Sequence, residues 1–125
     1  MKILANDGIS ESGKNKLEDY GFDVDLTKVS QEQLVNYVNE NSITVILVRS
    51  ATQIRADIID NCPSIKIIGR GGVGMDNIDV EYAQSKGINV INTPAASSKS
   101  VAELVFSHLF GCVRFLHESN RSMPL

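Results

Sequence analysis

Five short apolar runs, separated by roughly 20 residues, constrain the fold of this chain more than any other feature. Several of the runs are nearly continuous Ile, Val and Leu, which is typical of parallel strands covered on both faces. Segments with helical periodicity lie between them. The chain therefore predicts an α/β fold, a doubly wound, five-stranded parallel sheet of the flavodoxin-like kind. The predicted strands are residues 2–5, 22–26, 43–48, 65–68 and 88–92.

Two capping-box patterns predict where helices begin. Ser30 is followed three residues later by Gln33, and Ser100 is followed in the same way by Glu103. The second pattern opens the longest predicted helix, which we expect to run to about His117. That helix carries apolar residues around almost its whole circumference, and helices of this kind are normally buried on all sides.

Composition narrows the classes of function. The 125 residues suit one domain, and a net charge of −3 with interleaved acidic and basic residues argues against nucleic acid as a partner. The two cysteines, Cys62 and Cys112, form neither a disulfide framework nor a zinc motif. We therefore expect reduced thiols, a cytoplasmic protein and no metal. No apolar run approaches 18 residues and the N-terminus is unlike a signal peptide, so we expect no membrane partner.

Residues 69–74, Gly-Arg-Gly-Gly-Val-Gly, match the G-x-G-x-x-G pattern of dinucleotide sites and follow an apolar run. The context argues against that function, because a dinucleotide fingerprint opens a long helix directly and is followed about 20 residues later by an acid. Here Asp79 has the place of an N-cap for a short helix, and residues 88–92 end without an acid. Two interpretations remain: a nest of backbone N–H groups for a small anion, or a tight turn without a ligand.

Three stretches of the chain resemble one family in their order and spacing. They are residues 48–52 (Val-Arg-Ser-Ala-Thr), residues 68–79 around the glycines, and Asn-Thr-Pro at 92–94 leading to residues 100–104. Together they resemble the N-terminal, substrate-binding domain of the D-isomer-specific 2-hydroxyacid dehydrogenases, and most of all the phosphoglycerate dehydrogenases. The likeness covers nearly the whole chain.

The resemblance implies roles for five residues. Arg49 and Ser50 would hold the acidic or phosphate end of a substrate, at the carboxyl end of the third predicted strand, where ligands bind in open α/β sheets. The backbone amides of Val73 and Gly74 would take the substrate carboxylate, and Val73 would also contact the NAD cofactor. Ser97 would be a further substrate contact, although the family often has Asn at this place.

The same resemblance predicts the whole function. The chain would be the substrate-binding portion of an NAD-dependent oxidoreductase that acts on a D-2-hydroxy acid, with 3-phosphoglycerate of serine biosynthesis as the expected substrate. NAD would be bound mainly by a second domain outside these residues, so the chain would hold no catalytic residue and would be inactive alone. His108 and His117 are assigned to packing and to a helix C-terminus, and Asn77 to bracing its loop.

We expect the substrate-binding domain to span residues 1–117, with residues 100–117 as a helix crossing toward the missing domain and 118–125 as a tail. Without that domain the apolar helix would be exposed to water, so we expect a homodimer formed through residues 100–117. Other partners would be small hydroxy acids or phosphorylated acids.

Two alternatives stay open. The first is a non-enzymatic flavodoxin-like module, such as a receiver domain or a flavin carrier. A receiver needs an acid where the third strand ends, and this chain has Arg49 and Ser50 there. A flavin carrier needs a phosphate loop after the first strand, for which residues 6–9 (Asn-Asp-Gly-Ile) are poorly suited. The second alternative is the same domain of a glyoxylate- or lactate-type dehydrogenase.

Overall fold

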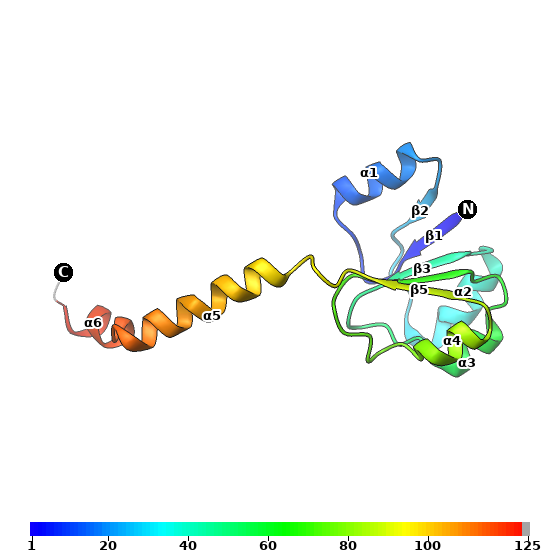
Figure 1. Cartoon of the computed structure of the whole chain (residues 1–125). Coiled ribbons are helices and arrows are strands. Elements are labelled where there is room, and N and C mark those ends of the chain that lie inside the picture. The colour runs from blue at the N-terminus through cyan, green and yellow to red at the C-terminus, as the bar shows by residue number, and fades with distance from the viewer. Residues whose placement is uncertain (124–125) are drawn as a thin grey trace. The chain divides into compact units, whose positions relative to one another are not determined.

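The structure, a computed structural model, describes residues 1–123 (Figure 1). The chain divides into two compact units, Met1–Thr93 and Pro94–Leu125, which are described separately here as the first unit and the second unit.

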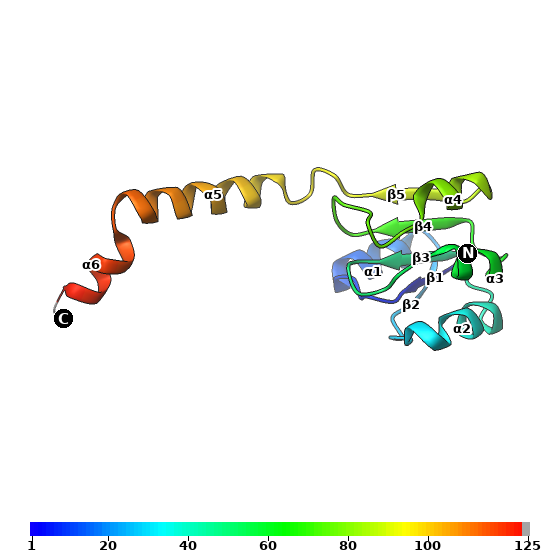
Figure 2. The same ribbon diagram turned by 90° about the horizontal axis from the view of Figure 1, so that it is seen from below.

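The first unit is built on a sheet of five parallel strands in the order β2-β1-β3-β4-β5, which can be followed in Figure 2. This order confirms the predicted doubly wound, flavodoxin-like sheet. The fourth strand begins two residues later than predicted, because Ile65 still belongs to the turn after a helix and donates its N–H to the Cys62 carbonyl (3.1 Å). The strands are β1 (Lys2–Ala5), β2 (Asp23–Asp25), β3 (Val45–Val48), β4 (Ile67–Arg70) and β5 (Asn89–Asn92).

Helices cover the two faces of this sheet unequally. Figure 1 shows α1 (Glu11–Asp19) on one face and α2 (Leu34–Glu40), α3 (Ala56–Asn61) and α4 (Val80–Ser85) on the other. The face with three helices holds the larger core, and the face with α1 holds a smaller cluster around Ile3 and Val45. The larger core includes the fully buried side chains Leu4, Leu34, Ile46 and Ile68.

The predicted capping box at Ser30 is right about where the helical segment begins and wrong about the capping hydrogen bond. Ser30 precedes a single turn of 3₁₀ helix, η1 (Gln31–Gln33), and its side chain makes no capping hydrogen bond. The helix α2 begins only at Leu34. A serine that the pattern did not single out does cap a helix: Ser10 Oγ accepts a hydrogen bond from the Gly13 N–H (3.2 Å) at the start of α1.

The second unit consists of two helices, α5 (Ser98–Val113) and α6 (Leu116–Ser122). The single helix predicted for residues 100–117 is therefore wrong at both ends. Ser100 lies inside α5 and is not its N-cap. Glu103 faces Lys99 one turn back (3.8 Å), so the apparent capping box is part of an ordinary helical surface.

The break between the two helices lies at Phe115, whose φ of 51° is left-handed. Left-handed backbone is unfavourable for a residue with a side chain, so this turn cannot be read from helical periodicity. His117 consequently lies in the first turn of α6, and its predicted place near a helix C-terminus is wrong. Most of the predicted tail is helical up to Ser122, and residues 124–125 lie outside the described residues.

The second unit does not bury its own apolar side chains. None of the residues of α5 or α6 is buried, and Leu104, Phe106 and Phe110 each expose more than half of their side-chain surface. The helices of residues 1–123 include none that is both long and apolar enough to cross a membrane.

Candidate functional site

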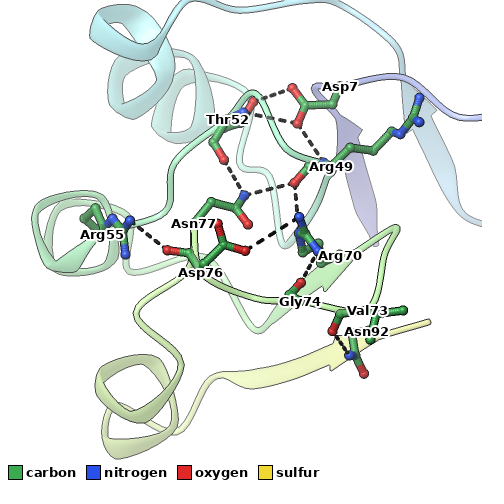
Figure 3. Close-up of polar contacts among 10 residues, drawn as sticks. All are labelled: Asp7, Arg49, Thr52, Arg55, Arg70, Val73, Gly74, Asp76, Asn77 and Asn92. Carbon is green, nitrogen blue, oxygen red and sulfur yellow. Dashed lines mark hydrogen bonds and ion pairs between the residues drawn. The ribbon is translucent and has the colours of Figure 1, made fainter. Parts of the chain in front are cut away.

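Asp7, two residues after the end of β1, holds the loop that follows β3, residues 49–52, which we call the β3 loop (Figure 3). Its carboxylate accepts hydrogen bonds from the Arg49 N–H (2.6 Å) and the Thr52 N–H (3.2 Å), and from the Thr52 hydroxyl (2.6 Å). The neighbouring Asn6 is buried and donates to the same hydroxyl oxygen (2.8 Å). Two residues at the end of one strand therefore shape the loop at the end of the next strand in the sheet.

The charge on Asp7 is stabilised by these contacts. Partial burial alone would raise the pKa of Asp7, but the hydrogen bonds from the Thr52 hydroxyl and from the backbone of Arg49, Thr52 and Ala51 outweigh burial and lower the pKa below its ordinary value. The carboxylate is thus ionised at neutral pH and keeps the β3 loop in place.

The loop after β4, residues 71–77, is tied to the β3 loop and is called the β4 loop. Asn77 is buried and donates to the carbonyls of Arg49 (3.0 Å) and Thr52 (2.7 Å), as expected of a bracing residue. Arg70 donates through Nε to the Arg49 carbonyl (3.2 Å) and through Nη1 to the Gly74 carbonyl. On the far side, Asn92 of β5 donates to the Val73 carbonyl (2.7 Å).

Four of the five predicted site residues lie on these two loops. The Arg49 side chain is exposed, points away from the braced cluster in Figure 3, and makes no hydrogen bond or ion pair within residues 1–123. Together with Ser50 it lines a hollow of about 410 Å³. Val73 is 53% exposed, and neither its amide nor that of Gly74 donates a hydrogen bond to another atom of the described chain. The arrangement leaves a cation and two N–H groups available to an anionic ligand.

Ser97 belongs to the second unit, where it is the N-cap residue of α5 without a side-chain capping bond. The structure therefore gathers Arg49, Ser50, Val73 and Gly74 in the first unit and carries Ser97 on the second unit.

The β4 loop lacks the features of a dinucleotide cradle. The next helix, α4, begins only at Val80, and β5 ends at Asn92 without a carboxylate. The guanidinium of Arg70 lies against the glycines, since a Cβ on Gly72 would be 2.8 Å from Arg70 Nη1. The β4 loop is therefore unlike the pyrophosphate-binding loop of a dinucleotide site, and the Val73 side chain on it is exposed.

Comparison with known proteins identifies the family of this chain. Residues 3–120 match the family described as D-isomer specific 2-hydroxyacid dehydrogenase, catalytic domain. The chain belongs to this family. The resemblance noted from the three sequence stretches is thereby confirmed.

Relatives in the family are much longer than this chain. It is 39% identical over 123 residues to a D-3-phosphoglycerate dehydrogenase of Methanocaldococcus jannaschii, which matches 98% of the chain but only 23% of that protein. It is 43% identical over 95 residues to a hydroxypyruvate reductase of Thermotoga maritima, covering 76% of the chain and 30% of that protein. Among solved structures, the NAD⁺-bound 3-phosphoglycerate dehydrogenase of Entamoeba histolytica is 29% identical with a TM-score of 0.73, over 89% of this chain and 38% of that one.

Both histidines of this dehydrogenase domain belong to the second unit. His108 is exposed on α5 and His117 on α6, so the packing role predicted for His108 is not provided by its own unit. The residues that sequence reasoning missed are the braces Asp7, Thr52 and Arg70. The only signal for Asp7 was its place at the end of the first strand, beside the strand that carries Arg49.

Proposed function

We propose that this chain is the substrate-binding portion of an NAD-dependent oxidoreductase that oxidises a D-2-hydroxy acid, with 3-phosphoglycerate as its substrate in serine biosynthesis. The observation that carries the proposal is the pairing of two loops: one presents the unpaired Arg49 guanidinium, and the other presents the open amides of Val73 and Gly74. A substrate with an anionic group at each end is what such a pair suits. Relatives named as phosphoglycerate dehydrogenases support this choice.

Each residue has a role in binding and orienting the substrate. The planar guanidinium of Arg49 and the hydroxyl of Ser50 hold the phosphate, because a guanidinium matches two phosphate oxygens at once. The amides of Val73 and Gly74 take the carboxylate, and the absence of a Cβ on Gly74 allows close approach. Ser97 supplies one more hydroxyl donor, with less reach than an Asn side chain would have. The substrate C2 is thereby directed toward the coenzyme.

The coenzyme and the proton-transfer groups belong to the part of the protein outside these residues. NAD supplies the hydride acceptor, and this chain contributes only the apolar Val73 side chain at its edge. We therefore propose that the 125-residue chain alone is inactive, that its substrate-binding domain spans residues 1–117 with 118–125 as the following segment, and that the enzyme works in the cytoplasm.

We also propose that the chain forms a homodimer through residues 100–117. The argument is the apolar surface of α5 and the start of α6, which the second unit leaves exposed at Leu104, Phe106, Leu109 and Phe110. A monomer rarely keeps an apolar surface of this extent in contact with water.

A second candidate is the reduction of hydroxypyruvate or a similar small 2-oxo acid. The relative from Thermotoga maritima favours it, as does serine in place of the Asn-Thr pair at residues 97–98. The two candidates differ in the phosphate, so Arg49 separates them. A phosphorylated substrate needs its guanidinium, and an uncharged hydroxymethyl end does not.

An NMR titration of the ¹⁵N-labelled chain tests the proposal. With 3-phosphoglycerate, amides of residues 49–50 and 72–75 should shift with a dissociation constant of about 1 mM, since one side of the site is open to water. Arg49→Ala should abolish these shifts, whereas Arg121→Ala on α6 should leave them unchanged. Binding of D-glycerate as tightly as 3-phosphoglycerate would favour the second candidate. Shifts confined to other residues would contradict both.

A further inference from the structure

Arg70 lies between the two loops to which the proposed function assigns the substrate. We infer that Arg70 is a positioning residue, whose guanidinium holds the β3 loop and the Val73–Gly74 segment at a constant separation, so that both ends of one substrate can be bound together. The inference rests on the function proposed above, because it concerns the same two loops.

The hydrogen bonds of Arg70 reach one carbonyl on each loop. Nε donates to the Arg49 carbonyl (3.2 Å), and Nη1 donates to the Gly74 carbonyl, as Figure 3 shows. These donors belong to one rigid, planar group, so the two carbonyls cannot move independently while both bonds persist. Only 13% of the Arg70 side-chain surface is exposed, so its donors are directed to protein rather than to solvent.

The neighbouring charged and polar groups do not replace this link. Asp76 lies 3.9 Å from Arg70 Nη2 and is 88% exposed, and an ion pair so open to water contributes little. Asn77 donates to the same Arg49 carbonyl (3.0 Å) and to Thr52, but it has no hydrogen bond to Gly74. Asn77 therefore fixes the end of the β4 loop, and Arg70 fixes the segment with the two open amides.

The Arg70 guanidinium accounts for the glycine at position 72. A Cβ added to Gly72 would lie 2.8 Å from Arg70 Nη1, too close for any real contact, and one added to Gly74 would lie 3.6 Å away. A Cβ added to Gly71 would instead meet Arg49 Cγ at 3.5 Å, an ordinary contact. Gly72→Ala should thus displace the Arg70 guanidinium without changing any charge. Gly71→Ala adds the same methyl group at the neighbouring residue without displacing Arg70, and it is the matched control.

The first experiment needs no ligand. In NMR spectra of the 125-residue chain, the Arg70 Nε–H should exchange slowly with water, because it is hydrogen-bonded and nearly buried. Gly72→Ala and Arg70→Lys should shift the amides of Ser50 and Thr52 on the other loop, whereas Asp76→Asn should not. A rapidly exchanging Nε–H, or β3-loop amides that ignore both variants, would overturn the inference whatever the ligand does.

The second experiment compares the dissociation constants of 3-phosphoglycerate and inorganic phosphate for each variant. In the wild type and in Gly71→Ala, the two-ended ligand should bind about tenfold more tightly than phosphate, since its carboxylate adds one charge-assisted contact. In Gly72→Ala and Arg70→Lys that ratio should fall to about one, with phosphate binding at Arg49 unchanged.

The remaining outcomes are distinguishable. Equal weakening of both ligands with a lower Tm would show a merely structural role, and a ratio preserved in Arg70→Lys would show that charge alone suffices. Either result overturns the inference. If the wild type binds 3-phosphoglycerate and phosphate equally tightly, the proposed two-ended site itself is overturned. If the wild type prefers 3-phosphoglycerate and Gly72→Ala keeps that preference, only the role of Arg70 is overturned.

Discussion

Leu34 in the first unit is fully buried under the sheet, whereas Leu104 in the second unit is 58% exposed on α5. Both are leucines on helices, and the sequence around each has helical periodicity. The difference is that the first unit supplies a sheet for its helices to cover, while the second unit supplies only another short helix. The first unit therefore has its own core, whereas the second unit leaves its apolar side chains exposed.

The two cysteines give the largest expected contrast between the units. Burial raises the pKa of Cys62 to about 11, so at pH 8 roughly one thiol in a thousand is ionised, whereas Cys112 is exposed. We expect the exposed Cys112 thiol to react with a disulfide reagent at submicromolar protein at least about a hundredfold faster than the buried Cys62 thiol. Cys112→Ser should remove the fast phase. A fast phase that persists in this variant would show that the first unit opens readily.

Truncating matched leucines tests the same comparison through stability. Leu34→Ala should lower the free energy of unfolding by about 2–5 kcal/mol, because it leaves a cavity in the larger core. At submicromolar protein, below the range in which the dimer is expected, Leu104→Ala should change it by less than about 0.5 kcal/mol, as is usual for exposed positions. Urea unfolding followed by circular dichroism measures both. Similar losses in the two variants would mean that α5 has a buried face in solution.

Self-association is the third test, because an exposed apolar helix should pair at higher concentration. Sedimentation velocity at micromolar concentration should show a dimer, and the doubly charged variant Phe106→Lys, Phe110→Glu should weaken it by tenfold or more, about 1.4 kcal/mol or more. Tyr20→Lys, an exposed aromatic in the first unit, is the matched control and should leave the dimer intact. A wild-type monomer across this range would contradict the proposed partner surface.

The smallest expected effect is the change in stability on replacing Asp7, a residue of the first unit. Its pKa is lower in the folded chain than in the unfolded chain, so its stabilising contribution is fully present at neutral pH. That contribution is lost as the pH falls from the ordinary carboxyl pKa through the lower folded value. Asp7→Asn should lower the free energy of unfolding by about 1 kcal/mol at pH 7. It should also reduce the loss of stability that the wild type shows as the pH falls through this range. An unchanged pH profile of unfolding would exclude Asp7 as the ionised brace.

Local patterns were sufficient for the topology, whereas the residues proposed to bind the substrate came from the family resemblance. The spacing of apolar runs predicted five parallel strands in the observed order, because period and length are properties of neighbouring residues. Arg49 and the glycine run could be placed at strand ends for the same reason. Helix boundaries were less secure, since Ser-x-x-Glu occurs at 100–103 inside a helix, and nothing local announces the left-handed Phe115.

The bracing of the site was decided by tertiary structure alone. Asp7 reaches the Arg49 amide across 42 residues of sequence, and the Arg70 guanidinium bridges Arg49 and Gly74 only because β3 and β4 are paired in one register. Hydrogen bonds of this kind depend on which strand ends lie side by side, and that is set by packing of the whole sheet. The sequence by itself therefore determined the strands and the loops that carry the proposed site residues, whereas the fold decided which side chains hold those loops in place.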